Sequence, residues 1–274
     1  MSAVPPITPD CQLGDGGEAA YIKLDDALTI RVSAMPDKNA NNSIQPSAKQ
    51  SEVDEFLRKV AAMPSVSPEG GRGRLIFALD ATASREPTWD RACRIQGEMF
   101  DATAALGGLD VQLVFYRGFN ECKASRWLSN GTSLHAAMRA VFCVGGETQI
   151  ARILRHAFTE AETHRIGALV FVGDAMEEKL DELCALAGKL GLRGVPAFVF
   201  HEGSDPTAAR AFKEIARLTR GAYCRFDATS ADELRALLGA VAAYAAGGRR
   251  ALADYGKATG GAALLLAHRL NGSE

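Results

Sequence analysis

The sequence has almost no excess of charge of either sign. Its 274 residues include 31 lysines and arginines and 33 aspartates and glutamates, which gives a net charge of −2. A chain that binds nucleic acid usually carries a basic excess gathered in a patch or stripe, and none is visible here. A nearly neutral chain also lacks the long-range field that draws proteins to anionic membranes. The composition therefore argues against nucleic acid and membranes as partners.

Long hydrophobic runs are also missing. The longest apolar stretch, the alanine-rich residues 236–246, is much shorter than the roughly 20 residues that a membrane-spanning helix needs. The first residues show neither the basic start nor the apolar segment of a secretory signal. With 47% hydrophobic and 23% charged residues, the composition is typical of a soluble globular protein. We expect a cytoplasmic location.

Short motifs of several common site types are absent as well. The six cysteines are widely spaced and form no CxxC pair, so we expect reduced thiols packed as small core residues. The five histidines form no HExxH pair, which argues against a zinc site. Neither a GxxxxGK[ST] phosphate loop nor a GxSxG nucleophile elbow occurs. The common motifs of nucleotide hydrolases and serine hydrolases are therefore not present.

The chain divides into four parts by composition. Residues 1–50 are rich in proline, glycine and polar side chains, and we predict a partly flexible N-terminal extension with a strand or hairpin at 21–32. Residues 51–73 are predicted to form a helix and a linker. Residues 74–245 are predicted to form the main domain. Residues 246–274 are predicted to form a C-terminal tail with a short apolar helix.

Short apolar runs alternate with amphipathic helices throughout the main domain. Wholly apolar strands are expected where both faces of a sheet are covered, and alternation with helices is typical of a parallel sheet. We therefore predict an α/β fold with a doubly wound, mostly parallel sheet flanked by helices. The expected strands are 75–79, 111–116, 124–128, 168–172, 196–200 and 222–226. The expected helices are 51–60, 89–106, 134–144, 149–163, 179–190, 208–218 and one that opens with a capping box at Ser230.

Oxygen-bearing side chains gather at the ends of two of these strands. Asp80, Thr82 and Ser84 directly follow the first strand, and alternate positions of one turn can converge on a single point. Thr148 stands near the start of a later helix, and Asp174 ends a later strand. Sites in such sheets lie at the carboxyl ends of the strands, so we expect all five at one rim. Oxygen donors of this kind suit a hard divalent cation such as Mg²⁺.

In this order, Asp80, Thr82, Ser84, Thr148 and Asp174 resemble the metal-ion-dependent adhesion site of the von Willebrand factor A (vWA) domain family. That site is written DxSxS, followed by a threonine and a later aspartate. The intervals, 64 residues from Ser84 to Thr148 and 26 from there to Asp174, suit the family's Rossmann-like topology. The resemblance covers about residues 74–244. It departs from the family where Thr82 replaces the first serine and where alanine follows Asp174 in place of glycine.

The resemblance implies a protein-binding module and no enzyme. It implies that Thr82, Ser84 and, in some members of the family, Thr148 touch a divalent cation directly, while Asp80 and Asp174 act largely through water. One open coordination position would then take an acidic side chain of a partner protein. Oxygen ligands accept Mg²⁺, Mn²⁺ and Ca²⁺ alike. Stand-alone, often bacterial members of the family work beside AAA+ ATPases, so an AAA+ ATPase-associated system is an implied partner.

Other interpretations of the same residues stay open at this point. The triplet from Asp80 to Ser84 alone also fits a turn that caps the following helix. A metal-dependent hydrolase or phosphotransfer enzyme would need a general base, and no histidine or lysine stands near the triplet. A degenerate domain that keeps the fold without metal is the third interpretation. We interpret His201 as a solvated loop residue and the pair at 177–178 as a solvated helix start.

Overall fold

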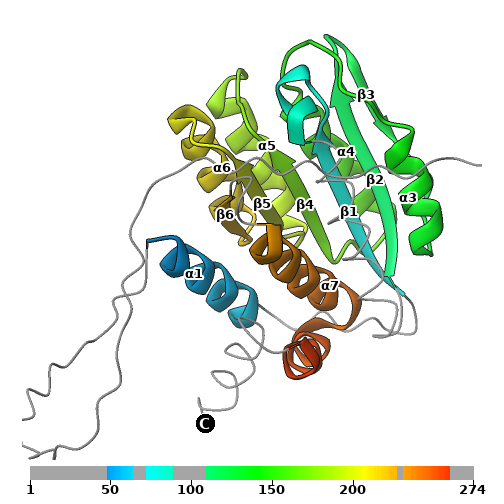
Figure 1. Cartoon of the computed structure of the whole chain (residues 1–274), viewed down its shortest axis with the longest axis vertical. Helices are drawn as coiled ribbons and strands as arrows, with labels where there is room; N and C mark the ends of the chain where they lie inside the picture. Colours follow the sequence, from blue (N-terminus) through cyan, green and yellow to red (C-terminus); the bar gives the residue numbers. More distant parts are fainter. Residues whose placement is uncertain (1–47, 64–71, 89–108, 227–230, 260–274) are drawn as a thin grey trace, which may run out of the picture. The chain divides into compact units, whose positions relative to one another are not determined.

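The computed structural model describes residues 48–63, 72–88, 109–226 and 231–259 (Figure 1). All of them belong to one compact unit, and the predicted domain limits stay a prediction. The expected features that lie outside the described residues are the strand or hairpin at 21–32, the helix at 89–106, the capping residue Ser230 and the short helix of the C-terminal tail.

Six strands form one sheet in the order β3-β2-β1-β4-β5-β6, which confirms the predicted α/β architecture. Every neighbouring pair is parallel except β2 and β3. The chain passes from β1 to β2 on one side and later returns to β4 on the other, so the winding direction reverses between β1 and β4. Ligands of such sheets bind at this reversal. The strands are β1 (Gly73–Asp80), β2 (Leu109–Arg117), β3 (Glu121–Ala124), β4 (Ala168–Gly173), β5 (Ala197–Glu202) and β6 (Ala222–Phe226).

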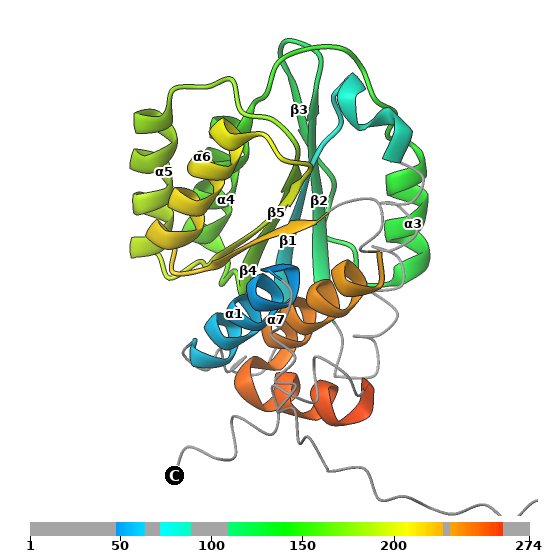
Figure 2. The same cartoon turned by 60° about the vertical axis from the view of Figure 1, so that its left-hand side comes forward.

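Helices cover both faces of the sheet, as Figure 2 shows. On one face α1, α3 and α7 pack on a core in which the Phe56 ring lies 5.9 Å from Phe198 and 5.3 Å from Phe200. On the other face α4, α5 and α6 pack on a core that includes Leu154 and Phe212. Burial on both faces explains why the central strands are apolar without alternation. The helices are α1 (Ala48–Ala62), α3 (Gly131–Arg139), α4 (Ile150–Thr163), α5 (Leu180–Leu192), α6 (Pro206–Leu218) and α7 (Ala231–Thr259), with a short 3₁₀ turn, η1 (Ala83–Arg85).

On the β2–β3 side of the sheet one predicted strand was wrong, and one predicted helix is present with other bounds, ending at Arg139. The third strand is β3 at 121–124, antiparallel to β2, and Leu128 of the predicted strand makes only an isolated bridge. An edge strand of half-buried and exposed residues has no apolar run to reveal it. The helix predicted at 134–144 is α3, which begins earlier because the Asn130 side chain accepts a hydrogen bond from Ser133 N.

The last helix continues past residue 245. Its backbone leaves helical dihedral angles at Gly247 and Gly248, and Leu252 and Tyr255 beyond this break are again buried in the core. None of the described helices has the length and hydropathy to cross a membrane. The four cysteines in the described ranges are free thiols.

Candidate metal centre

Asp80 ends β1 at the point where the winding direction of the sheet reverses. The residue is fully buried. Its Oδ1 accepts a hydrogen bond of 2.8 Å from Thr82 N, and its Oδ2 accepts one of 2.8 Å from the Tyr116 hydroxyl. Tyr116 is the register partner of Asp80 on β2. The carboxylate is therefore fixed at both oxygens, one by its own turn and one by the neighbouring strand.

The two hydroxyls that follow Asp80 converge as the sequence predicts. Thr82 Oγ1 and Ser84 Oγ lie 3.1 Å apart, and η1 begins between them at Ala83. Thr82 is 6% exposed, whereas Ser84 is exposed to solvent. Two hydroxyl oxygens that could act as metal ligands thus lie close together at the rim, and solvent reaches them from the Ser84 side.

Asp174 lies beside Asp80 because β1 and β4 are adjacent. Leu79 pairs with Val172 in their register, so Asp80 is opposite Gly173 and Asp174 comes next. Asp174 Oδ1 is buried without a hydrogen-bond partner. Burial raises the pKa of Asp80, hydrogen bonds from Thr82 and Tyr116 oppose that rise, and the negative charge of Asp174 adds to it. The rim thus concentrates negative charge and leaves one carboxylate oxygen unsatisfied.

Thr148 is held by the loop that follows β4. Its Oγ1 accepts a hydrogen bond of 3.0 Å from Glu177 N, and its own N donates one of 2.9 Å to Glu177 Oε2. Within the described residues no hydrogen bond joins Thr148 to the turn from Asp80 to Ser84. The structure therefore brings Thr148 to the Asp174 side of the rim through Glu177.

The interpretation of residues 177–178 as a solvated helix start was wrong for Glu178, whereas Glu177 is exposed to solvent although it also bonds to Thr148. Both lie in the loop before α5, and the carboxylate of Glu178 accepts hydrogen bonds from Ile150 N at 2.6 Å and Ala151 N at 2.9 Å. An acidic group at this end of α4 satisfies free N–H groups and interacts favourably with the helix dipole. Burial raises the pKa of Glu178, while these two hydrogen bonds lower it. The pair anchors Thr148 and the start of α4 to the β4 loop.

The loop at 141–149 is fastened to the same edge. Val144 N donates a hydrogen bond of 3.0 Å to Ala81 O. Gly146 packs directly on Gly118, and a Cβ at position 146 would collide with the backbone of that turn. Only a glycine therefore allows this close approach. Through these contacts the Thr148 loop reaches both the turn after β1 and the turn after β2.

Two buried charged or titratable residues at this edge were not foreseen from the sequence. Arg85, directly after Ser84, is 1% exposed, and its Nη1 lies 2.5 Å from Glu202 Oε2. His201 is not a solvated loop residue: β5 extends to Glu202, and the imidazole is fully buried with Nδ1 2.9 Å from the Tyr223 hydroxyl. Burial lowers the pKa of His201, which favours the neutral ring. Arg85 follows a polar turn, so nothing in the local pattern signals its burial.

The donor set suits a hard divalent cation. In the described part of the chain, no three His, Cys, Asp or Glu side chains gather where they could hold a metal, so a cation at this rim depends on hydroxyl ligands. The hydroxyls of Thr82 and Ser84, with the unsatisfied oxygen of Asp174, are of the kind that Mg²⁺, Mn²⁺ and Ca²⁺ accept.

Solved structures with a similar fold come from several proteins. A von Willebrand factor type A protein from Catenulispora acidiphila is 15% identical with a TM-score of 0.53, over 63% of this chain and 43% of its own. The pilus adhesin SpaC from Lactobacillus rhamnosus GG is 12% identical with a TM-score of 0.51, over 67% and 32%. Proximal thread matrix protein 1 from the mussel byssus is 15% identical with a TM-score of 0.50, over 65% and 47%. The chain thus spans less than half of each. No model of a known protein family matches the sequence, and no curated protein matches it either.

Proposed function

We propose that this chain, which has the fold of a von Willebrand factor type A domain, is a protein-binding module that captures an acidic side chain of a partner through a divalent cation. Thr82, Ser84 and Thr148 would supply hydroxyl ligands, and Asp80 and Asp174 would orient the site through hydrogen bonds and water. When bound, the cation supplies a Lewis-acid centre with a position open to a carboxylate.

The unsatisfied, buried oxygen of Asp174 is the observation that carries this proposal. A buried polar atom without a partner is costly, and a second carboxylate nearby adds repulsion. Arg85, the buried cation that follows Ser84, forms its ion pair with Glu202 at 2.5 Å, so its charge is balanced by Glu202. A divalent cation would balance both aspartates.

The surrounding residues hold the donors in place. Tyr116 fixes one oxygen of Asp80 from β2, so the carboxylate cannot rotate freely. Glu177 holds Thr148 at both its backbone N and its hydroxyl, which leaves one lone pair of that oxygen for a ligand. Rigid donors lower the entropic cost of binding an ion.

We favour binding over catalysis because, within the described residues of the rim, no histidine is accessible to act as a general base. His201 is the histidine on the strand next to Asp174, and it is fully buried and bonded to Tyr223. A hydrolase or phosphotransfer enzyme would need a base that reaches solvent-borne substrate. The partner class, an AAA+ ATPase-associated system in a bacterial cytoplasm, rests on the sequence resemblance alone.

A scaffold without metal is the second candidate. The contacts of Thr148 with Glu177 and the raised pKa of Asp80, which favours the protonated carboxyl, both fit a rim that functions without a cation. The two candidates differ in one direct measurement, which is the affinity for Mg²⁺ or Mn²⁺.

The test is calorimetric titration of Mg²⁺ and Mn²⁺ into the full chain, with and without excess acetate as a carboxylate probe. We expect saturable binding that is lost in Ser84→Ala and in Asp174→Asn. Ser204→Ala, an exposed serine in the loop before α6, is the matched control and should bind as the wild type does. Absence of binding in the wild type even with acetate present would overturn the metal proposal in favour of the scaffold.

A further inference from the structure

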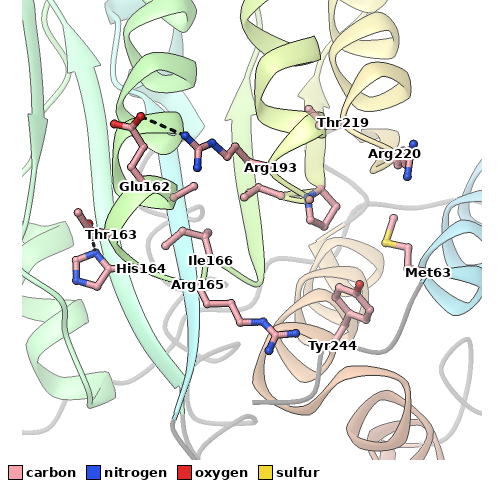
Figure 3. A pocket seen from close by; sticks show the side chains of 15 residues that line it. Met63, Glu162, Thr163, His164, Arg165, Ile166, Arg193, Thr219, Arg220 and Tyr244 are labelled. Atoms are coloured by element: carbon pink, nitrogen blue, oxygen red, sulfur yellow. Dashed lines mark hydrogen bonds and ion pairs between the residues drawn. The ribbon is translucent and has the colours of Figure 1, made fainter. Parts of the chain in front are cut away.

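A cavity lies at the amino-terminal edge of the sheet, opposite the candidate metal centre (Figure 3), and is called the second cavity below to distinguish it from that centre. Its volume is about 620 Å³, which falls in the range of small-molecule sites. Three loops line most of it, those that lead into β4, β5 and β6. Because β4 is six residues long, the cavity and the candidate metal centre are separated by roughly 20 Å, the length of such a strand.

The cavity carries an excess of positive charge. Arg165, Arg193 and Arg220 each come from a different one of the three loops, and the acidic residue among the lining is Glu162. Arg193 pairs with Glu162 at 3.3 Å, as the dashed line in Figure 3 shows. Arg165 extends along the cavity toward Tyr244. Neither Arg165 nor Arg220 forms an ion pair with any residue that the structure describes, so the lining has a net charge of about +2 at neutral pH.

Arg220 occupies this place at a conformational cost. Helices α5 and α6 end in the same way, with the backbone N of the second residue past the cap bonded back to the last turn: Val195 N to Leu190 O at 3.3 Å, and Gly221 N to Ala216 O at 2.8 Å. This motif needs one residue in the left-handed region, usually glycine. In α5 that residue is Gly194, with φ of 74°, whereas in α6 it is Arg220, with φ of 58°.

A strained residue at a cavity wall points to a function of its side chain. Arginine in this left-handed backbone conformation is strained relative to glycine. The local turn gains nothing from a guanidinium, since the motif depends only on backbone atoms. The cavity explains the choice, because Arg220 adds the third positive charge to its lining.

We propose that this cavity binds a small organic phosphate, with the net positive charge of the lining attracting the phosphate and the apolar lining holding the organic part. A phosphomonoester carries close to two negative charges at neutral pH, which matches the excess charge of the lining. Guanidinium groups bind phosphate oxygens through paired N–H donors. Ile166, Val195 and Pro196 supply the apolar wall. The proposal is independent of the metal centre, which lies at the other edge of the sheet.

The test is calorimetric titration of the full chain with AMP, with adenosine and with inorganic phosphate, all in excess chelator so that the metal centre is silent. We expect AMP to bind and adenosine to bind at least tenfold more weakly, because the phosphate makes the charged contacts. Inorganic phosphate should compete with AMP. Asp80→Asn should bind AMP as the wild type does.

Three variants test the role of charge in the cavity: one should weaken AMP binding, one should strengthen it, and one is a control outside the cavity. Arg165→Gln should raise the Kd for AMP about tenfold or more, since a charge-assisted contact is lost. Glu162→Gln should lower the Kd about two- to fivefold, because it removes the negative charge and frees Arg193. Arg139→Gln makes the same charge change on α3, away from the cavity, and should leave the Kd within twofold.

Two results would overturn the proposal. One is the absence of saturable binding of both AMP and inorganic phosphate to the wild type. The other is equal weakening by Arg165→Gln and Arg139→Gln, which would assign the effect to net charge and not to the cavity. The Tm of each variant is measured with and without AMP. A variant that has lost only a contact keeps the wild-type Tm without AMP and gains less Tm with it, whereas a variant with a damaged fold has a lower Tm in both cases.

Discussion

The Tyr116 hydroxyl donates a hydrogen bond of 2.8 Å to Asp80 Oδ2 from the position directly opposite Asp80 on β2. This bond lies inside the sheet, where both residues are fully buried. It stabilises the ionised carboxylate against the burial that disfavours it. The protonation of Asp80 therefore depends on a residue of a neighbouring strand, and the dependence can be measured.

The stability of the metal-free protein should fall with rising pH because of Asp80. Its pKa is raised above the ordinary value of 3.8, so the folded chain holds its proton to higher pH than the unfolded chain does. The stabilisation is fully present below about pH 4, near the unfolded-state pKa, and is lost as the pH rises through the folded-state pKa. We expect the unfolding free energy of the wild type, minus that of Asp80→Asn, to decrease as the pH rises over that range, because only the wild type loses this contribution. Urea unfolding in chelator measures it, and a difference that is constant or increases with pH would contradict the assignment.

Gly146→Ala should damage the rim, whereas Gly145→Ala should not. A Cβ at position 146 would collide with the backbone of Gly118, while one at position 145 meets nothing within 4 Å. We expect the first variant to lose about 1–3 kcal/mol of stability, as overpacking does, and to bind Mn²⁺ more weakly because the Thr148 loop shifts. The second should stay within about 0.5 kcal/mol of the wild type. Equal effects of the two variants would disprove the close approach.

The buried ion pair between Arg85 and Glu202 should be costly to break from one side only. The side chains are 1% and 13% exposed, and Thr88 Oγ1 also donates to the carboxylate at 3.1 Å. Arg85→Met or Glu202→Gln alone should destabilise by about 3–5 kcal/mol, since the remaining partner stays buried and unpaired. The double variant should lose less than the sum of the two. Additive losses in a double-mutant cycle would show that the two side chains are not coupled.

Arg220→Gly should stabilise the fold and weaken the proposed phosphate site. Glycine adopts the left-handed backbone without strain, so we expect a gain of about 1 kcal/mol in unfolding free energy. Gly194→Ala places the strain in the equivalent turn of α5 and should cost a similar amount. Thermal unfolding gives the stability change and calorimetry with AMP gives the affinity. A variant that is more stable and binds AMP unchanged would leave the strain at Arg220 without a function.

The sequence predicts the buried strands and their ends, because each buried strand is a continuous apolar run. The strand predicted at 222–226 coincides with β6, and Asp80 and Asp174 lie at the predicted rim because apolar runs mark the ends of β1 and β4. The edge strand β3 escapes prediction because its exposed residues follow no apolar pattern.

Contacts between distant segments are the part that periodicity cannot reveal. The hydrogen bonds between Glu177 and Thr148 join residues that are 29 positions apart in the sequence, and they form only because two loops meet after folding. The three arginines of the second cavity stand 28 and 27 residues apart in the sequence, and only the strand order places their loops side by side. His201 was misjudged because a histidine at a strand end gives no local sign of burial.

The break in α7 at Gly247 and Gly248 has a consequence for how much chain the domain requires. Beyond the break, Tyr255 packs so closely on Gly239 that a Cβ at that glycine would collide with the tyrosine hydroxyl, and Leu252 is fully buried in the core. A fragment ending at residue 245 would retain all six strands and yet expose the apolar surface that these two residues cover. We therefore expect the autonomous folding unit to extend to at least residue 255, because the last turns of α7 cover part of the core.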